Sequence, residues 1–258
     1  MPDKELLVID AADLPNRKLT ITYQAPSYGD YRKAKRIYPY PTRESEVGPN
    51  YSVEELLFAS MLTKIEVKTE ASNKEIPMEA QDLPSRLASF PIDDRQAMMI
   101  EFIETNFLDK DYSRSAKAFA VEERVKPLTQ TTVIPGSITP SGKSYVLNRP
   151  NTSTQWKADN SYKSAQENGC TLDEMLVAMC LQSIDQTAIT ELPKDIMCLL
   201  DEERIDDVQF ICTIFVNLFL LDNDGAEAAK ARGKLKKAAL GKKKSPSKRV
   251  STPTATLA

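Results

Sequence analysis

The sequence contains an internal repeat, and this repeat constrains the fold more than any other feature. Residues 52–66 align without a gap to residues 171–185. Each copy opens with a Ser/Thr-x-x-Glu capping box, in which the hydroxyl accepts a backbone N–H and the glutamate accepts the cap N–H. We therefore expect two helices that begin at equivalent places in two related halves. The caps are Ser52 and Thr171, and the identical pairs are Glu55/Glu174, Leu57/Leu176, Ala59/Ala178, Leu62/Leu181 and Ile65/Ile184.

The similarity extends to both sides of this segment. Upstream, residues 20–26 resemble residues 144–150. Downstream, Asp93-Asp94-Arg95 resembles Glu202-Glu203-Arg204, with four extra residues before the next apolar stretch of the second copy. The alternation of residues 65–69 predicts a strand. We expect an α+β fold that is mostly helical, with two similar lobes from an internal duplication, short β elements and a disordered basic C-terminal tail.

Composition shifts predict the boundaries of these parts. Residues 126–154 contain four prolines and many Ser and Thr, which indicates a linker or an extended loop. Few apolar residues beyond 225 predict a segment that is partly helical or disordered. The expected parts are a first lobe at 1–125, a linker at 126–143, a second lobe at 144–224 and a basic tail at 225–258.

The net charge of −3 hides an asymmetry along the chain. Residues 225–258 carry ten Lys/Arg and one Glu, a charge of +9, whereas the other 224 residues carry 24 basic and 36 acidic side chains, a charge of −12. Such an arm could bind a nucleic acid, an anionic surface or the acidic body of another copy. The alternative is a solvated tail that keeps the chain soluble. The basic arm centres on Lys234, Lys236, Lys237, Lys242, Lys243 and Lys244.

The chain has no histidine, which excludes several catalytic designs. A Ser/His/Asp triad, a Cys/His pair and a His-ligated metal all need an imidazole. The four cysteines form no C-x-x-C pair, so we expect free thiols and neither disulfides nor a metal. Gly142-Lys143-Ser144 does not complete a phosphate loop, because five residues separate it from Gly136 where the motif has four. We expect no cofactor and no catalytic residues.

Acidic and apolar clusters have structural interpretations. The paired carboxylates at 93–94, 201–203 and 206–207 suit acid/base work or a divalent ion, but acids before a helical pattern also cap free N–H groups, which we favour. The N-terminus lacks the features of a signal peptide. The apolar run at 208–221 is 14 residues long, too short to span a bilayer, and predicts a buried helix and no membrane association.

Aromatic and basic residues alternate over residues 28–40. Rings with Lys and Arg between them grip single-stranded nucleic acid. Tyr31 and Tyr38 are also seven residues apart, which places them on one helical face and favours packing against a partner. Trp156, at the matching place of the second half, is interpreted as a packing anchor.

These motifs together resemble proteins of contractile-tailed bacteriophages in the baseplate hub and tail-assembly chaperone group. The carriers are Leu19-Thr20-Ile21, Tyr28-Gly29-Asp30-Tyr31-Arg32 and the segment from Leu56 to Val67 with its Leu-Leu-x-Ala core. The resemblance covers Leu19 to Leu108, with an echo from Ser144 to Asp222. The basic tail is not part of the pattern.

The resemblance implies a non-enzymatic assembly protein, either a structural component or a chaperone. Its expected partners are other tail or baseplate proteins, and a homo-oligomer stays open. Its expected location is the host cytoplasm during assembly, with the virion as an alternative. The second hypothesis is a nucleic-acid-associated accessory protein that binds through the basic tail. The expected protein-binding residues are Leu56, Leu57, Met61, Tyr31, Tyr38 and Trp156.

Overall fold

A computed structural model describes residues 5–37, 52–68, 73–76, 90–126 and 129–220. Residues 1–219 form one compact unit, which contains two four-stranded antiparallel sheets and the helices packed on them. The expectation of an α+β, mostly helical fold with short β elements is therefore confirmed. The expected basic tail lies outside the described residues.

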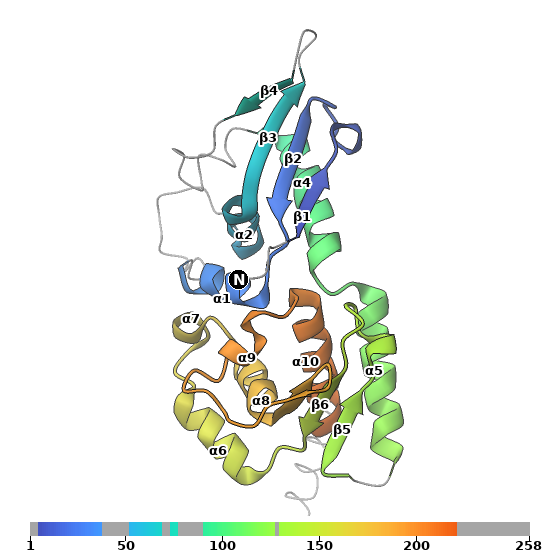
Figure 1. The fold of residues 1–258 in the computed structure, drawn as a ribbon, viewed down its shortest axis with the longest axis vertical. Coiled ribbons are helices and arrows are strands. Elements are labelled where there is room, and N and C mark those ends of the chain that lie inside the picture. The colour runs from blue at the N-terminus through green and yellow to red at the C-terminus, as the bar shows by residue number, and fades with distance from the viewer. Residues whose placement is uncertain (1–4, 38–51, 69–72, 77–89, 127–128, 221–258) are drawn as a thin grey trace, which may run out of the picture. The chain divides into compact units, whose positions relative to one another are not determined.

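The first sheet is built from residues of the N-terminal half (Figure 1). Tyr23 on β2 contacts Phe58 of α2 and Phe102 of α4 with ring centroids 5.7 and 5.4 Å apart, so both helices cover the same face. Burial of these aromatic rings supplies the core of this half. In spatial order the strands are β1 (Leu6–Ile9), β2 (Leu19–Gln24), β3 (Leu62–Lys68) and β4 (Asn73–Ile76), and the helices are α1 (Tyr28–Ile37), α2 (Val53–Met61) and α4 (Ile92–Asn106).

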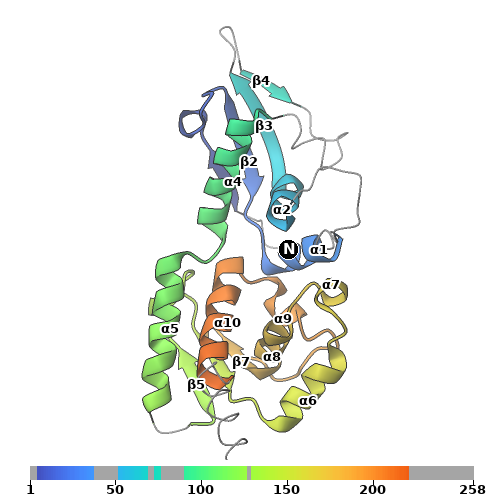
Figure 2. The ribbon, with the colours of Figure 1, turned by 180° about the vertical axis from the view of Figure 1, so that it is seen from behind.

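The second sheet follows with the same strand order. Its strands are β5 (Thr131–Ile134), β6 (Tyr145–Asn148), β7 (Leu181–Ile184) and β8 (Thr187–Ala188). Its helices are α6 (Thr152–Ser161), α7 (Ala165–Asn168), α8 (Leu172–Cys180), α9 (Cys198–Asp201) and α10 (Ile205–Phe219). Helix α5 (Lys110–Val125) runs alongside α10 (Figure 2).

Both predicted capping boxes are present, and they start α2 and α8. Ser52 and Thr171 each accept the N–H of the glutamate three residues on, and that glutamate accepts the N–H of the cap. The apolar stretch predicted as a buried helix is α10, in which Val208 and Ile214 are fully buried. The predicted strand at 65–69 is the second part of β3.

The two halves agree in their irregular features as well as in their regular ones. A short 3-10 turn joins the first two strands of each sheet, at Ala11–Asp13 and at Gly136–Ile138. Four residues after each 3-10 turn, the connection contains a residue with positive φ, Arg17 at 51° and Gly142 at 81°. A bulge then interrupts the next strand pair, between Thr22 and Tyr23 and between Val146 and Leu147.

Parts of the chain expected as linker belong to the second sheet. Residues 131–134 form edge strand β5 and pair with β6 in register, because alternate residues Thr132 and Ile134 are buried under the helices. Helix α5, expected at the end of the first lobe, packs on α10 through Tyr112 and Phe210, whose ring centroids are 6.2 Å apart. Within the described ranges, no helix has the length and apolar composition needed to cross a bilayer.

Candidate functional site

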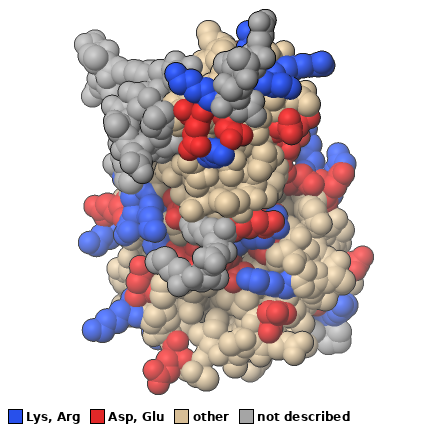
Figure 3. Space-filling model, turned by 45° about the horizontal axis from the view of Figure 1, so that its top comes forward, with Lys and Arg blue, Asp and Glu red and all other residues tan. Residues whose placement is uncertain are grey.

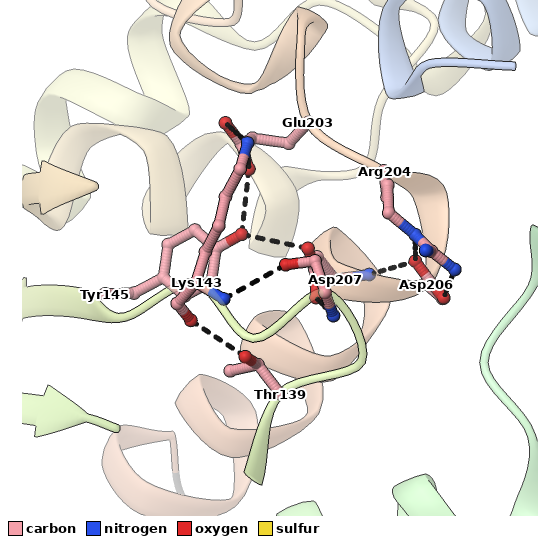
Figure 4. Close-up of polar contacts among 8 residues, drawn as sticks. Thr139, Lys143, Tyr145, Glu203, Arg204, Asp206 and Asp207 are labelled. Atoms are coloured by element: carbon pink, nitrogen blue, oxygen red, sulfur yellow. Dashed lines mark hydrogen bonds and ion pairs between the residues drawn. The ribbon is translucent and has the colours of Figure 1, made fainter. Parts of the chain in front are cut away.

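A buried polar cluster, formed by Lys143, Tyr145, Glu203 and Asp207, joins β6 to the start of α10 (Figure 4). The phenolic oxygen of Tyr145 lies 2.8 Å from Glu203 Oε2 and 3.1 Å from Asp207 Oδ2. Lys143 Nζ donates to both oxygens of Glu203, at 3.1 and 3.0 Å. Asp207 Oδ1 accepts the backbone N–H of Ser141 at 3.1 Å. We call these four residues the Tyr145 cluster.

The Tyr145 cluster is suited to holding structure and not to catalysis. Tyr145 and Asp207 have no exposed surface, and Glu203 is 5% exposed. Burial raises the pKa of Tyr145 well above its ordinary value, and the charges of Asp207 and Glu203 raise it further. The phenol therefore keeps its proton and donates it to one carboxylate at a time. The cluster fixes the β5–β6 turn on the N-terminal end of α10.

The first half carries a reduced version of this arrangement. Asp94, in the first turn of α4, is 1% exposed and accepts the N–H of Asn16 at 3.0 Å through Oδ1. Its Oδ2 is buried without a hydrogen-bond partner. Ile21 faces Ile65 across β2 and β3, just as Tyr145 faces Ile184 across β6 and β7. An isoleucine thus occupies the place of the tyrosine.

Helix α1 joins the two halves. Its Arg32 is buried, with Nη1 2.6 Å from Asp201 Oδ1 and Nη2 donating to the carbonyl of Asn168 at 3.3 Å. The N–H of Tyr28 donates to the carbonyl of Glu203 at 2.7 Å. Gly29 is required there, because a Cβ would lie 2.9 Å from the Cβ and the carbonyl oxygen of Asp201. The alternating aromatic and basic residues at 28–36 therefore mostly contact other parts of the same chain.

Exposed isoleucines lie along α4, beside the face that Met99 and Phe102 bury in the core. Ile92, Ile100 and Ile103 are 74%, 58% and 41% exposed. At 100° per residue the three lie within about 80° of one another and extend over about 16 Å. Single exposed apolar residues are ordinary, whereas several on one helix face mark an interaction surface. Ile100 and Ile103 are neighbours on this face, and the exposed Gln96 lies between Ile100 and Ile92. We call these three residues the α4 stripe.

The expected protein-binding residues separate into buried and exposed ones. Leu56, Leu57 and Tyr31 are 2%, 0% and 9% exposed, so the expectation that they form a binding face is wrong. Apolar positions at helical spacing pack here against the chain's own core. Met61 is half-buried. Trp156 is 67% exposed and does not act as the expected packing anchor. Tyr38 lies outside the described residues.

The carboxylates at 93–94 and 206–207 lie in the first turns of α4 and α10, as the dipole interpretation expects, but Asp94 does not cap its own helix. Pro91 precedes α4 and makes no side-chain cap, and Asp94 bonds to the distant Asn16. Asp206 pairs with Arg204 at 2.6 Å and accepts the N–H of Asp207 at 2.9 Å. Among the described residues no group of three or more acidic, Cys or His side chains has the geometry of a metal site. The basic arm, Lys234 to Lys244, lies outside the described ranges.

Figure 3 shows one face of the molecule, on which acidic and basic side chains are interspersed. Side chains of opposite charge lie next to one another in several places, so the described residues of this face form no single-sign field of the kind that attracts a polyanion.

Sequence reasoning missed Asp201, Tyr145 and Ile21 as structurally important positions. One signal was available. The tripeptide Ile-Asp-Asp opens both α4, at 92–94, and α10, at 205–207. This shared tripeptide would pair Asp94 with Asp207 in place of the pairing of 93–95 with 202–204.

The chain matches no known protein family, and neither a curated protein nor a solved structure is similar to it.

Proposed function

We propose that this chain is a non-enzymatic assembly protein of a contractile bacteriophage tail or baseplate, which acts by binding other tail proteins. The observation that carries the proposal is the α4 stripe, three isoleucines that the fold leaves in solvent. Exposed isoleucines favour an interface, because their burial stabilises a complex by about 25 cal/mol per Å² of apolar area. The sequence resemblance over Leu19 to Leu108 supports the choice of partner class.

The proposal includes an internal duplication. Support comes from the equal order of strands in the two sheets, the equivalent positive-φ turns and the equivalent bulges. Capping boxes begin α2 and α8, and an Ile-Asp-Asp tripeptide begins α4 and α10. A duplicated lobe offers two related surfaces to a tail, which is itself built from repeated subunits.

The test is genetic and structural. We expect that deletion of the gene from the phage that encodes it gives particles without complete tails by electron microscopy. A triple variant, Ile92→Ser with Ile100→Ser and Ile103→Ser, should fail to restore tails although the protein stays folded by circular dichroism. The matched control replaces Val121, Val125 and Val133, which are exposed elsewhere, with Ser. Full complementation by the triple variant would contradict the role of the α4 stripe, and normal tails after deletion would contradict the function.

The second candidate is a nucleic-acid accessory role through residues 225–258, favoured by their charge of +9. Binding through such an arm depends on counterion release and weakens steeply with salt. An interface built on the α4 stripe would keep its affinity as the salt concentration rises. A salt titration of each association therefore separates the two.

A further inference from the structure

A cavity of about 460 Å³ is lined by residues of α1, α6, α8 and the segment 192–197. Its volume falls within the range of about 300–1,000 Å³ that is typical of small-molecule sites. Three of its lining side chains are methionines, Met175, Met179 and Met197. Methionine is flexible and polarizable, so such a wall adapts to apolar groups of different shape.

Four cations line the same cavity. They are Arg32, Arg36, Lys157 and Lys194. Among the described residues that line the cavity, Asp195 carries the one carboxylate. Arg36 Nε donates to the carbonyl oxygen of Glu167, which carries no charge. Within the described ranges, no carboxylate lies within 4 Å of the charged nitrogens of Arg36, Lys157 or Lys194. Arg32 is itself paired with Asp201 at 2.6 Å and lies 3.8 Å from Asp195, so the excess positive charge of the lining comes from Arg36, Lys157 and Lys194.

A buried donor at this cavity also lacks an acceptor. The Arg32 side chain is 5% exposed, and its Nη1 and Nη2 are held by Asp201 and Asn168. Its Nε–H is buried and makes no hydrogen bond. Because Nε has no accessible surface, an anion in the cavity would be attracted by the charge of Arg32 and not bound through this N–H.

We propose that this cavity is a binding site for a small organic anion with an apolar body, such as a medium-chain carboxylate. The anionic group lies among Arg32, Arg36, Lys157 and Lys194, and the apolar body lies against the methionines. This goes beyond the assembly function, because the site is separate from the α4 stripe and takes a small molecule. Recognition needs both parts, since cations alone would accept inorganic phosphate and methionines alone would accept a neutral amphiphile.

Isothermal titration calorimetry on the full chain tests the ligand class. The probes are decanoate below its micellar concentration, octyl glucoside as a neutral amphiphile and inorganic phosphate as an anion without an apolar body. We expect saturable binding of one decanoate per chain and at least tenfold weaker binding of the other two. Absence of saturable decanoate binding, or equal affinity for either control probe, would overturn the proposal.

Two sets of variants locate the site. Lys157→Gln with Lys194→Gln should weaken decanoate binding at least tenfold, whereas Lys18→Gln with Lys68→Gln removes the same charge from exposed positions of the first half and should leave it unchanged. Asp195→Asn should tighten binding severalfold, because it removes the carboxylate while its Oδ1 still accepts the N–H of Met197. Opposite responses of the two cavity variants cannot come from unfolding. Equal affinity in the cavity and control variants would refute the assignment.

Discussion

Asp207 and Asp94 occupy the same position in the first turns of α10 and α4, yet within the described part of the chain only Asp207 has a partner on both carboxylate oxygens. Asp207 accepts the N–H of Ser141 and lies 3.1 Å from the phenol of Tyr145. Asp94 accepts the N–H of Asn16, and its second oxygen is buried without a partner. The difference follows from one side chain, because Ile21 stands where the second half has Tyr145.

Tyr145→Phe should destabilise the protein by about 1–3 kcal/mol. The variant keeps the ring but removes the O–H that two buried carboxylates share, and an unsatisfied buried group costs about that much. Tyr112→Phe is the matched control, since Tyr112 is 39% exposed and its ring contact with Phe210 is kept. Urea denaturation measures both free energies of unfolding, and an equal effect of the two substitutions would show that the phenol of Tyr145 contributes nothing.

Asp207→Asn should cost more stability than Asp94→Asn. The first change disturbs the contact with Tyr145, and hydrogen bonds to charged groups are worth about 1.5–3 kcal/mol. The second leaves the bond from Asn16 in place and has no partner to lose on the other oxygen. Equilibrium unfolding of the two variants under one set of conditions gives the comparison. The reverse order of stability would contradict the asymmetry between the halves.

Local features were predictable from the sequence because local chemistry fixes them. A capping box needs four consecutive residues, and both boxes are present at Ser52 and Thr171. The burial of α10 was also predictable, because a helix of this apolar composition is stable in water only when the core covers it.

Long-range relations were not predictable in the same way. Arg32 and Asp201 are 169 residues apart in sequence, and neither carries a local signal for the other. Leu56 and Leu57 belong to a continuous apolar run of α2, which indicates burial but not whether the chain itself or a partner covers them. Trp156 is exposed because α6 turns it away from Ala158, which is the buried residue of that helix.

Gly29→Ala should destabilise the contact between α1 and α9. In an open helix this change is favourable by about 0.5–1 kcal/mol, because alanine has the higher helix propensity. At Gly29 the new methyl group meets Asp201 at 2.9 Å, so the sign should reverse. Ser153→Ala, at the exposed equivalent position of α6, is the control and should change little. Thermal denaturation followed by circular dichroism decides, and a stabilised Gly29→Ala variant would show that α1 and α9 are not in close contact.

The free energy of unfolding should fall as the pH rises from about 9 to 11. Burial raises the pKa of the Cys170 thiol to about 11 and that of Cys180 to about 12. The folded protein therefore keeps protons that the unfolded chain, with ordinary thiol pKa values, has already lost, and the stability present below pH 9 is lost through this window. Urea unfolding at four pH values measures the slope. Cys170→Ala with Cys180→Ala should reduce the slope without abolishing it, because burial also raises the pKa values of Cys212 and Tyr145. A stability that rises over this range would contradict the assignment.

Deletion of residues 225–258 should leave the folded body intact and weaken association. The compact unit ends at Phe219, so the truncated chain keeps every described contact of both sheets and should melt within a few degrees of the full chain. The deleted segment carries a charge of +9 against −12 in the rest of the chain, and exposed charges are screened beyond about 8 Å at physiological ionic strength. Association should therefore be stronger for the full chain at low salt and become equal for both chains at high salt.

Fluorescence anisotropy with a labelled DNA duplex measures binding to nucleic acid, and sedimentation velocity of the protein alone measures self-association. The prediction fails if the truncated body unfolds, or if both chains associate equally at low salt.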